Sequence, residues 1–93
     1  MVRVFVLYGE EPDAQTYAEH AELCRLVPGG TFRHGKVFGS PMGDPAHRYI
    51  AEWEFADQAA FEAAAASDEF RATGRDARER GLPQPTVEFA SLS

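Results

Sequence analysis

The opening segment, Val2–Tyr8, is apolar on both of its faces, and this constrains the fold more than any other feature of the sequence. Its β-branched and aromatic content predicts a strand. One face would carry Val2, Val4, Val6 and Tyr8. Phe5 and Leu7 make the other face apolar too, which is typical of a strand that is covered on both sides. A chain of 93 residues has little material for two covering layers, so we expect something else to cover the second face.

Turn and capping residues divide the rest of the chain into further elements. Alternating apolar residues predict three more strands, at Thr31–Phe38, Arg48–Phe55 and Thr86–Leu92. Helical periodicity and N-cap residues predict two helices, at Ala14–Val27 after Asp13 and at Gln58–Ala66 after Asp57. Ser67 resembles one more helix start, and we expect Phe70–Arg80 to form an exposed, charged helical turn or two, weakened at Gly74.

The order strand-helix-strand-strand-helix-strand is that of the ferredoxin-like α+β fold. In this fold a four-stranded antiparallel sheet carries both helices on one face. The interpretation makes residues 1–93 a single domain, with Phe5 and Leu7 on the uncovered face. Two such sheets packed face to face would bury that side. The sequence therefore predicts a homodimer built as an α+β barrel, with any pocket between helix and sheet or inside the barrel.

The charge of the chain excludes several classes of partner. Nine basic residues stand against fifteen acidic ones, which gives a net charge of −6. Nucleic acids and anionic membranes are bound by clustered cations, so we expect neither as a partner. No segment approaches the roughly 18 apolar residues of a membrane span, and the first strand is too short for a signal peptide. Because Cys24 is the only cysteine, the sequence indicates a cytoplasmic protein without disulfides.

Three short stretches resemble a known family. They are Val6-Leu7-Tyr8-Gly9, His20-Ala21-Glu22-Leu23 followed by Val27-Pro28-Gly29, and Ile50-Ala51-Glu52. In these stretches the chain resembles the EthD-like family of the dimeric α+β barrel superfamily, whose members carry His-x-Pro-Leu and then Leu-Pro-Gly at this spacing. Glu22 stands where the family has proline, and Tyr17 fits the aromatic residues usual before the histidine. The resemblance covers residues 1–66 and, loosely, the last strand; residues 67–85 are not placed.

The resemblance implies the dimeric fold and suggests an activity. Relatives in the superfamily include cofactor-free monooxygenases, cyclases of aromatic polyketides and lactone isomerases. We therefore expect a cofactor-independent oxidoreductase, monooxygenase or cyclase that acts on a hydrophobic, oxygenated aromatic metabolite. The alternative is a non-catalytic ligand-binding or accessory homodimer in a degradation pathway. A third possibility, a protein interface, rests only on the charged stretch Arg71–Arg80.

His20 and Glu52 are the candidate catalytic residues. His20 falls within the apolar stripe of its helix, and an imidazole there can act as general acid or base toward an enolisable or phenolic substrate. Its alternative role is that of a core histidine that holds a carbonyl or a carboxylate. Glu52 could orient His20, bind a substrate hydroxyl, or pair with Arg3, Arg33 or Arg48 across the strands.

Aromatic residues supply the candidate substrate-binding set, although most aromatic residues of a small domain simply form its core. The set is Tyr8, Tyr17, Phe32, His34 and Trp53. We expect no metal site, because His20 and Cys24 are the only pair of ligand types at a useful helical spacing. We also expect no cofactor, because no glycine-rich nucleotide fingerprint is present. Cys24 lies on the apolar stripe and is expected to pack rather than react.

Overall fold

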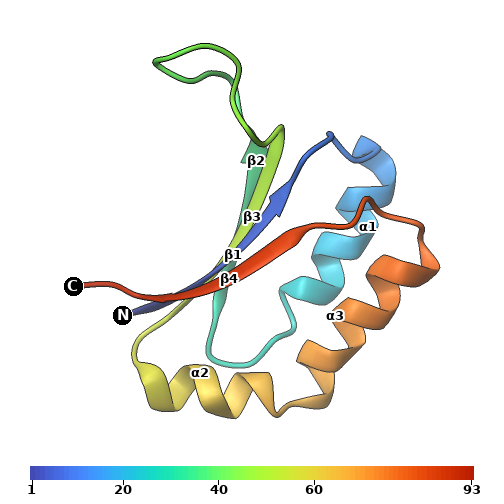
Figure 1. Cartoon of the computed structure of the whole chain (residues 1–93). Helices are drawn as coiled ribbons and strands as arrows, with labels where there is room; N and C mark the ends of the chain where they lie inside the picture. Colours follow the sequence, from blue (N-terminus) through green and yellow to red (C-terminus); the bar gives the residue numbers. More distant parts are fainter.

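The computed structural model of residues 1–93 contains four strands and three helices. In chain order they are β1 (Val2–Tyr8), α1 (Ala14–Cys24), β2 (Thr31–Lys36), β3 (Tyr49–Phe55), α2 (Gln58–Ala65), α3 (Asp68–Glu79) and β4 (Thr86–Ser91). The strands form one antiparallel sheet in the order β2-β3-β1-β4. The helices all lie on one side of it (Figure 1). The predicted ferredoxin-like α+β fold is therefore confirmed.

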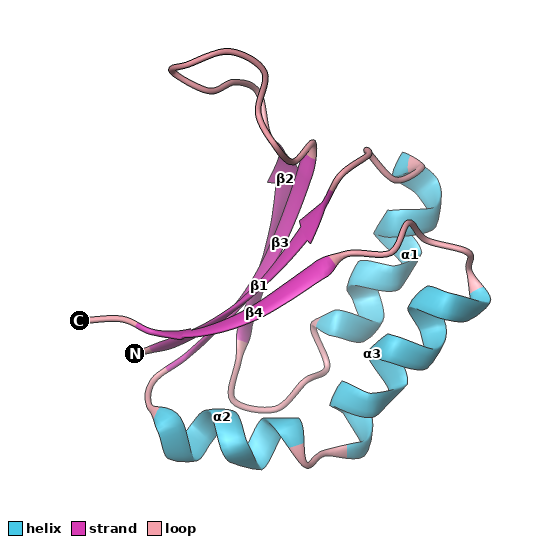
Figure 2. Ribbon diagram, in the orientation of Figure 1, coloured by secondary structure: helices cyan, strands magenta, loops and turns pink.

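The core lies between the sheet and the helices. The predicted inner face of β1 is buried, and so is the inner face of β3, which consists of Ala51, Trp53 and Phe55. Tyr17, Ala21 and Cys24 of α1 pack against this layer. Side chains of alternate residues point to opposite faces of a strand, so these buried positions place the residues between them on the far face. Phe5 and Leu7 are accordingly half-buried on a face that no helix covers (Figure 2).

Several element boundaries differ from those predicted. The first helix ends at Cys24 instead of Val27, because the chain tightens into a turn in which Leu26 N–H donates to the carbonyl of Leu23 at 3.0 Å. The second strand ends at Lys36, and Phe38 is fully exposed in the loop that follows. Figure 1 shows this loop reaching beyond the end of the sheet.

The charged stretch after residue 67 forms a complete helix, which corrects the expectation of a turn or two. The Ser67 hydroxyl accepts a hydrogen bond from Phe70 N–H at 3.1 Å and caps α3. Acidic Asp68 and Glu69 occupy its first turn and basic Arg78 its last, which matches the helix dipole. These end effects, together with packing of α3 beside α1, outweigh the cost of a glycine within the helix.

Candidate functional site

A cavity of about 640 Å³ lies between α3 and the sheet. Its walls come from β1, β3, α3 and β4, and its lining residues are Val4, Val6, Tyr8, Trp53, Phe70, Arg71, Thr73, Gly74, Arg75, Ala77, Arg78, Pro85, Val87 and Phe89. The volume is within the range of small-molecule sites, about 300–1,000 Å³. Figure 2 shows α3 running alongside the sheet face that β1 and β4 share.

The polar atoms of the buried cavity walls already have partners. The Tyr8 hydroxyl donates to the Tyr17 hydroxyl at 3.3 Å. The Trp53 indole N–H donates to the carbonyl of Cys24 at 2.9 Å, and the Thr73 hydroxyl donates to the carbonyl of Phe70 at 2.7 Å. A ligand inside the cavity would therefore meet the aromatic and aliphatic surfaces of these residues. Such a site favours an apolar ligand, because polar groups buried without a partner cost free energy.

Three arginines of α3 supply the charge at the rim of the cavity. Arg71 is held by the carboxylate of Asp68 at 2.9 Å and by the carbonyl of Ala66 at 2.9 Å. Arg75 and Arg78 make no side-chain hydrogen bond or ion pair in the structure. The sequence places these arginines in the charged stretch Arg71–Arg80 but does not indicate a ligand site there. Their spacing, one and two turns along a helix, is the signal that could have indicated a common face.

His20 and Asp76 join α1 to α3 behind the cavity. His20 Nδ1 lies 2.8 Å from Asp76 Oδ2, and His20 Nε2 lies 3.4 Å from Cys24 Sγ. Arg80 Nε donates to the same Asp76 oxygen at 2.8 Å, and its Nη1 donates to Glu19 at 2.7 Å. His20 and Cys24 are buried. Both ring nitrogens of the histidine are therefore engaged inside the protein.

Burial and hydrogen bonding shift the pKa values of Asp76 and Cys24 in opposite directions. Burial favours the neutral carboxyl of Asp76, but the hydrogen bonds from His20 and Arg80 outweigh it and hold the pKa of that carboxyl below its usual value. The ionised Asp76 can accept a hydrogen bond from His20 Nδ1–H, and in that tautomer of the neutral ring Nε2 can accept one from the Cys24 thiol. Burial, aided by the charge of Asp76, raises the pKa of Cys24 to about 12. The thiol thus stays protonated at neutral pH, as expected of a packing cysteine.

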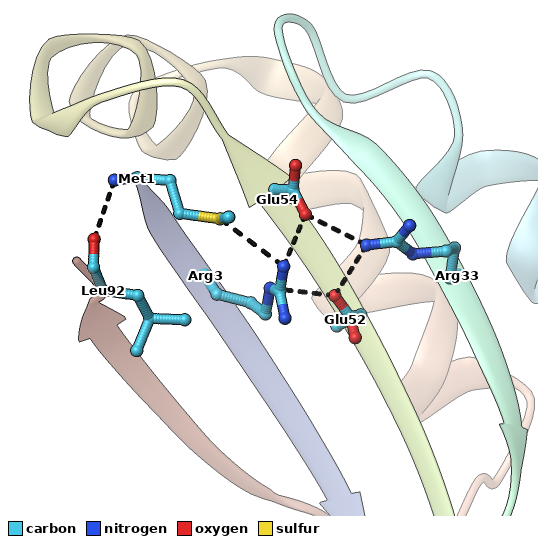
Figure 3. A network of polar contacts seen from close by, with 6 residues as sticks. All are labelled: Met1, Arg3, Arg33, Glu52, Glu54 and Leu92. Carbon is cyan, nitrogen blue, oxygen red and sulfur yellow. Dashed lines mark hydrogen bonds and ion pairs between the residues drawn. The ribbon is translucent and has the colours of Figure 1, made fainter.

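Glu52 does not orient His20, which corrects one of the roles considered for it. Glu52 lies on the open face of the sheet, opposite the face that packs on the helices (Figure 3). Its Oε2 is 3.0 Å from Arg3 Nε and 3.2 Å from Arg33 Nη2. Glu54 also contacts both arginines. The cross-strand ion pairing considered for Glu52 is the arrangement observed, and Asp76 is the carboxylate that holds His20.

Two of the five predicted substrate-binding residues line the cavity, and three lie elsewhere. Tyr8 and Trp53 line the cavity. Tyr17 and His34 instead pack with Tyr49 into an aromatic cluster, in which His34 Nδ1 lies 2.6 Å from the Tyr49 hydroxyl. The fifth residue, Phe32, stacks at a tilt on the indole of Trp53, with ring centroids 4.9 Å apart.

Burial sets the titration of this aromatic cluster. It lowers the pKa of His34 and raises the pKa of Tyr17.

No three side chains of the metal-ligating types gather at one point in the structure. None of the helices combines the length and the apolar character needed to cross a bilayer.

Comparison with known proteins supports the predicted resemblance. No family model matches the chain, and no curated protein does. An EthD family protein of Bacillus halodurans has a solved structure that matches 100% of this chain and 99% of its own, with a TM-score of 0.78 and 29% sequence identity. The chain is therefore similar to an EthD family protein over its whole length, as the sequence motifs predict. It carries the predicted motif residues His20, Leu23, Pro28 and Gly29.

Two more distant structures share the fold of this chain. A dimeric ferredoxin-like protein of unknown function from Jannaschia sp. is 19% identical, with a TM-score of 0.71 and coverage of 98% of each chain. SnoaB, a cofactor-independent oxygenase from Streptomyces nogalater, is 20% identical, with a TM-score of 0.59 and coverage of 98% of this chain and 90% of that one.

Proposed function

We propose that this EthD-like protein binds a hydrophobic, oxygenated aromatic metabolite in the cavity between α3 and the sheet. The observation that carries the proposal is the cavity itself: about 640 Å³, with aromatic and aliphatic walls and with the polar atoms of its buried residues already paired. Tyr8 and Trp53 supply flat surfaces on which an aromatic ring can stack. The volume is sufficient for a ligand of two or three fused rings.

We also propose that the binding protein is a homodimer joined through the open faces of two sheets. Phe5, Leu7 and Ile50 are half-buried on that face in the single chain. A layer that covers them would remove apolar surface from water, at roughly 25 cal/mol per Å². The Jannaschia relative is described as dimeric, and so is a ferredoxin-like protein from Thermobifida fusca. Two sheets facing each other would also enclose the charged network around Arg3 and Glu52.

A second candidate function is catalysis, as a cofactor-independent oxygenase or cyclase with His20 as the acid–base group. The fold shared with SnoaB favours it, and so does the ionised Asp76, which can hold an imidazole in one orientation. Tyr17 and Tyr8 connect His20 to the cavity. The Tyr17 ring packs edge-on against His20, with centroids 5.3 Å apart, and its hydroxyl is bonded to that of Tyr8. The non-catalytic alternative, a ligand-binding or accessory homodimer, requires the cavity but no chemical role for His20.

Thermal melts against hydroxylated aromatics, quinones and lactones test the binding proposal. A ligand at one hundred times its Kd stabilises the folded state by about 2.7 kcal/mol, which is roughly 10 °C or more for a domain of this size. Ala77→Leu adds bulk to a cavity wall and should abolish the shift. Ala63→Leu makes the same change on an exposed position of α2 and should retain it. If no compound shifts the melt, or if both variants retain the shift, the cavity is not the binding site.

The catalytic candidate is tested on any ligand found in this way. Product formation and dioxygen uptake are measured with wild type and with His20→Gln. Catalysis through His20 predicts turnover in wild type and its loss in the variant, while the ligand-dependent melting shift is kept. Turnover that is unchanged in the variant would remove His20 from the mechanism. Binding without turnover by wild type would favour the ligand-binding or accessory role.

A further inference from the structure

We infer that the ligand of the cavity is an aromatic acid, whose carboxylate is bound by Arg75 and Arg78 at the cavity rim. This inference rests on the proposed function and specifies its ligand. Both arginines line the cavity, one turn apart on the same helix. They are the charged groups at this site that the protein itself does not neutralise, whereas Arg71 is held by Asp68.

The absence of partners for Arg75 and Arg78 is notable in a chain with a net charge of −6. Glu79 lies four residues after Arg75, at the spacing of a helical ion pair, yet no such pair forms. On the same helix Arg80 does pair with Asp76, at 2.8 Å. The two free guanidinium groups are thus left available on the side of α3 that faces the cavity.

Gly74 keeps the rim open between these arginines. A Cβ built at Gly74 would lie 3.8 Å from Nη1 of Arg78, so the guanidinium of Arg78 lies back along the helix over the glycine. Gly74 itself lines the cavity. Since glycine has no side chain, an anionic group can approach both the helix surface and the guanidinium at this point.

The chemistry of the site then defines the ligand class. Guanidinium groups are planar, remain charged at neutral pH, and bind carboxylates through paired hydrogen bonds. The interior walls present apolar surface, with the polar atoms of Tyr8, Trp53 and Thr73 already paired. A molecule that fits both the apolar walls and the two arginines has an aromatic ring system for the cavity interior and a carboxylate at its edge.

Two probes of equal shape and different charge test the inference: 2-naphthoate and its neutral amide, 2-naphthamide. Their affinities are measured by calorimetry with wild type, with Arg75→Gln/Arg78→Gln, and with Arg25→Gln/Arg48→Gln. The last variant loses the same charge at two exposed positions outside the cavity. We expect wild type and this control to bind the carboxylate about tenfold more tightly than the amide, the scale of a charge-assisted contact. The cavity variant should lose that preference while it still binds the amide.

The outcomes separate the two proposals. If wild type binds both probes equally, or if the cavity variant keeps the preference for the carboxylate, the inference is wrong while binding in the cavity stands. If neither probe binds to wild type, and the three-ring anthracene-2-carboxylate also fails, the proposed function is wrong and the inference falls with it. Raised salt provides a further check, since it should weaken carboxylate binding and leave amide binding unchanged.

Discussion

His20 and Asp76 form a polar contact of 2.8 Å, and it joins two helices that are distant in sequence. The position of His20 in a buried stripe could be predicted from helical periodicity. Its partner could not be predicted, because Asp76 lies on α3, whose charged sequence does not indicate a complete helix. A single sequence does not reveal which carboxylate meets a buried histidine across 56 residues. The same limit explains why Glu52, on the opposite face, was considered for that role.

Asp76→Asn should destabilise the protein by about 1–3 kcal/mol at pH 7, because it removes an ionised acceptor that holds both His20 and Arg80. The pKa of Asp76 is lowered from 3.8 on folding, so its contribution is complete above that pH. The contribution is lost as the pH falls from 3.8 through the folded pKa.

Urea unfolding at pH 7 and at a series of pH values below 4 measures this effect. The difference between wild type and Asp76→Asn should shrink as the medium becomes more acidic. Asp44→Asn, in the exposed loop between β2 and β3, serves as the control and should unfold like wild type. Equal stabilities of wild type and Asp76→Asn at pH 7 would show that the contact contributes nothing.

Cys24 should resist alkylation while the protein is folded. Burial raises its pKa to about 12 and leaves almost no thiolate at pH 8. We expect iodoacetamide to modify the thiol only after unfolding in urea, as followed by mass spectrometry. Rapid modification of the native protein would mean that the region around His20 opens readily to solvent.

Among the secondary-structure elements, α3 is the one whose extent was hardest to predict from the sequence. It also supplies much of the lining of the cavity. Periodicity predicted the inner faces of β1 and β3, because alternate apolar residues have a single arrangement on a sheet with one packed face. In contrast, α3 is rich in charge and contains Gly74, so its pattern resembles an exposed segment. Its charged residues prove to be divided between the cavity rim and the contact with α1.

Substitution of Gly74 tests whether this glycine serves the site and not the helix. Gly74→Ala should raise the free energy of unfolding by about 0.5–1 kcal/mol, since alanine favours helix and the new Cβ clashes with nothing. Gly81→Ala should have the opposite effect, because Gly81 follows the helix with φ of +69°. Chemical denaturation of both variants measures these two opposite changes in the free energy of unfolding. A destabilised Gly74→Ala would point to a structural need for the glycine.

At the scale of the whole molecule, a second copy of the chain accounts for the open face of the sheet. The apolar pattern of β1 led to this expectation from the sequence alone. We expect sedimentation to give twice the 10.3 kDa mass of one chain.

Leu7→Glu places a charge next to Ile50 and Thr86 on that face and should yield a folded monomer. Leu26→Glu, at a site that is 66% exposed and lies beyond α1, should remain dimeric. A wild-type monomer at micromolar concentration would contradict the barrel arrangement.

The cavity can be probed most directly through Trp53, which is the only tryptophan of the chain and lines the cavity wall. Its fluorescence is followed while 2-hydroxy-1,4-naphthoquinone, an oxygenated aromatic that quenches indole emission, is added to wild type and to Ala77→Leu. We predict saturable quenching in wild type and only the weak, linear quenching of random collisions in the variant. Linear quenching in both proteins, or the same saturable curve in both, would contradict ligand binding between α3 and the sheet.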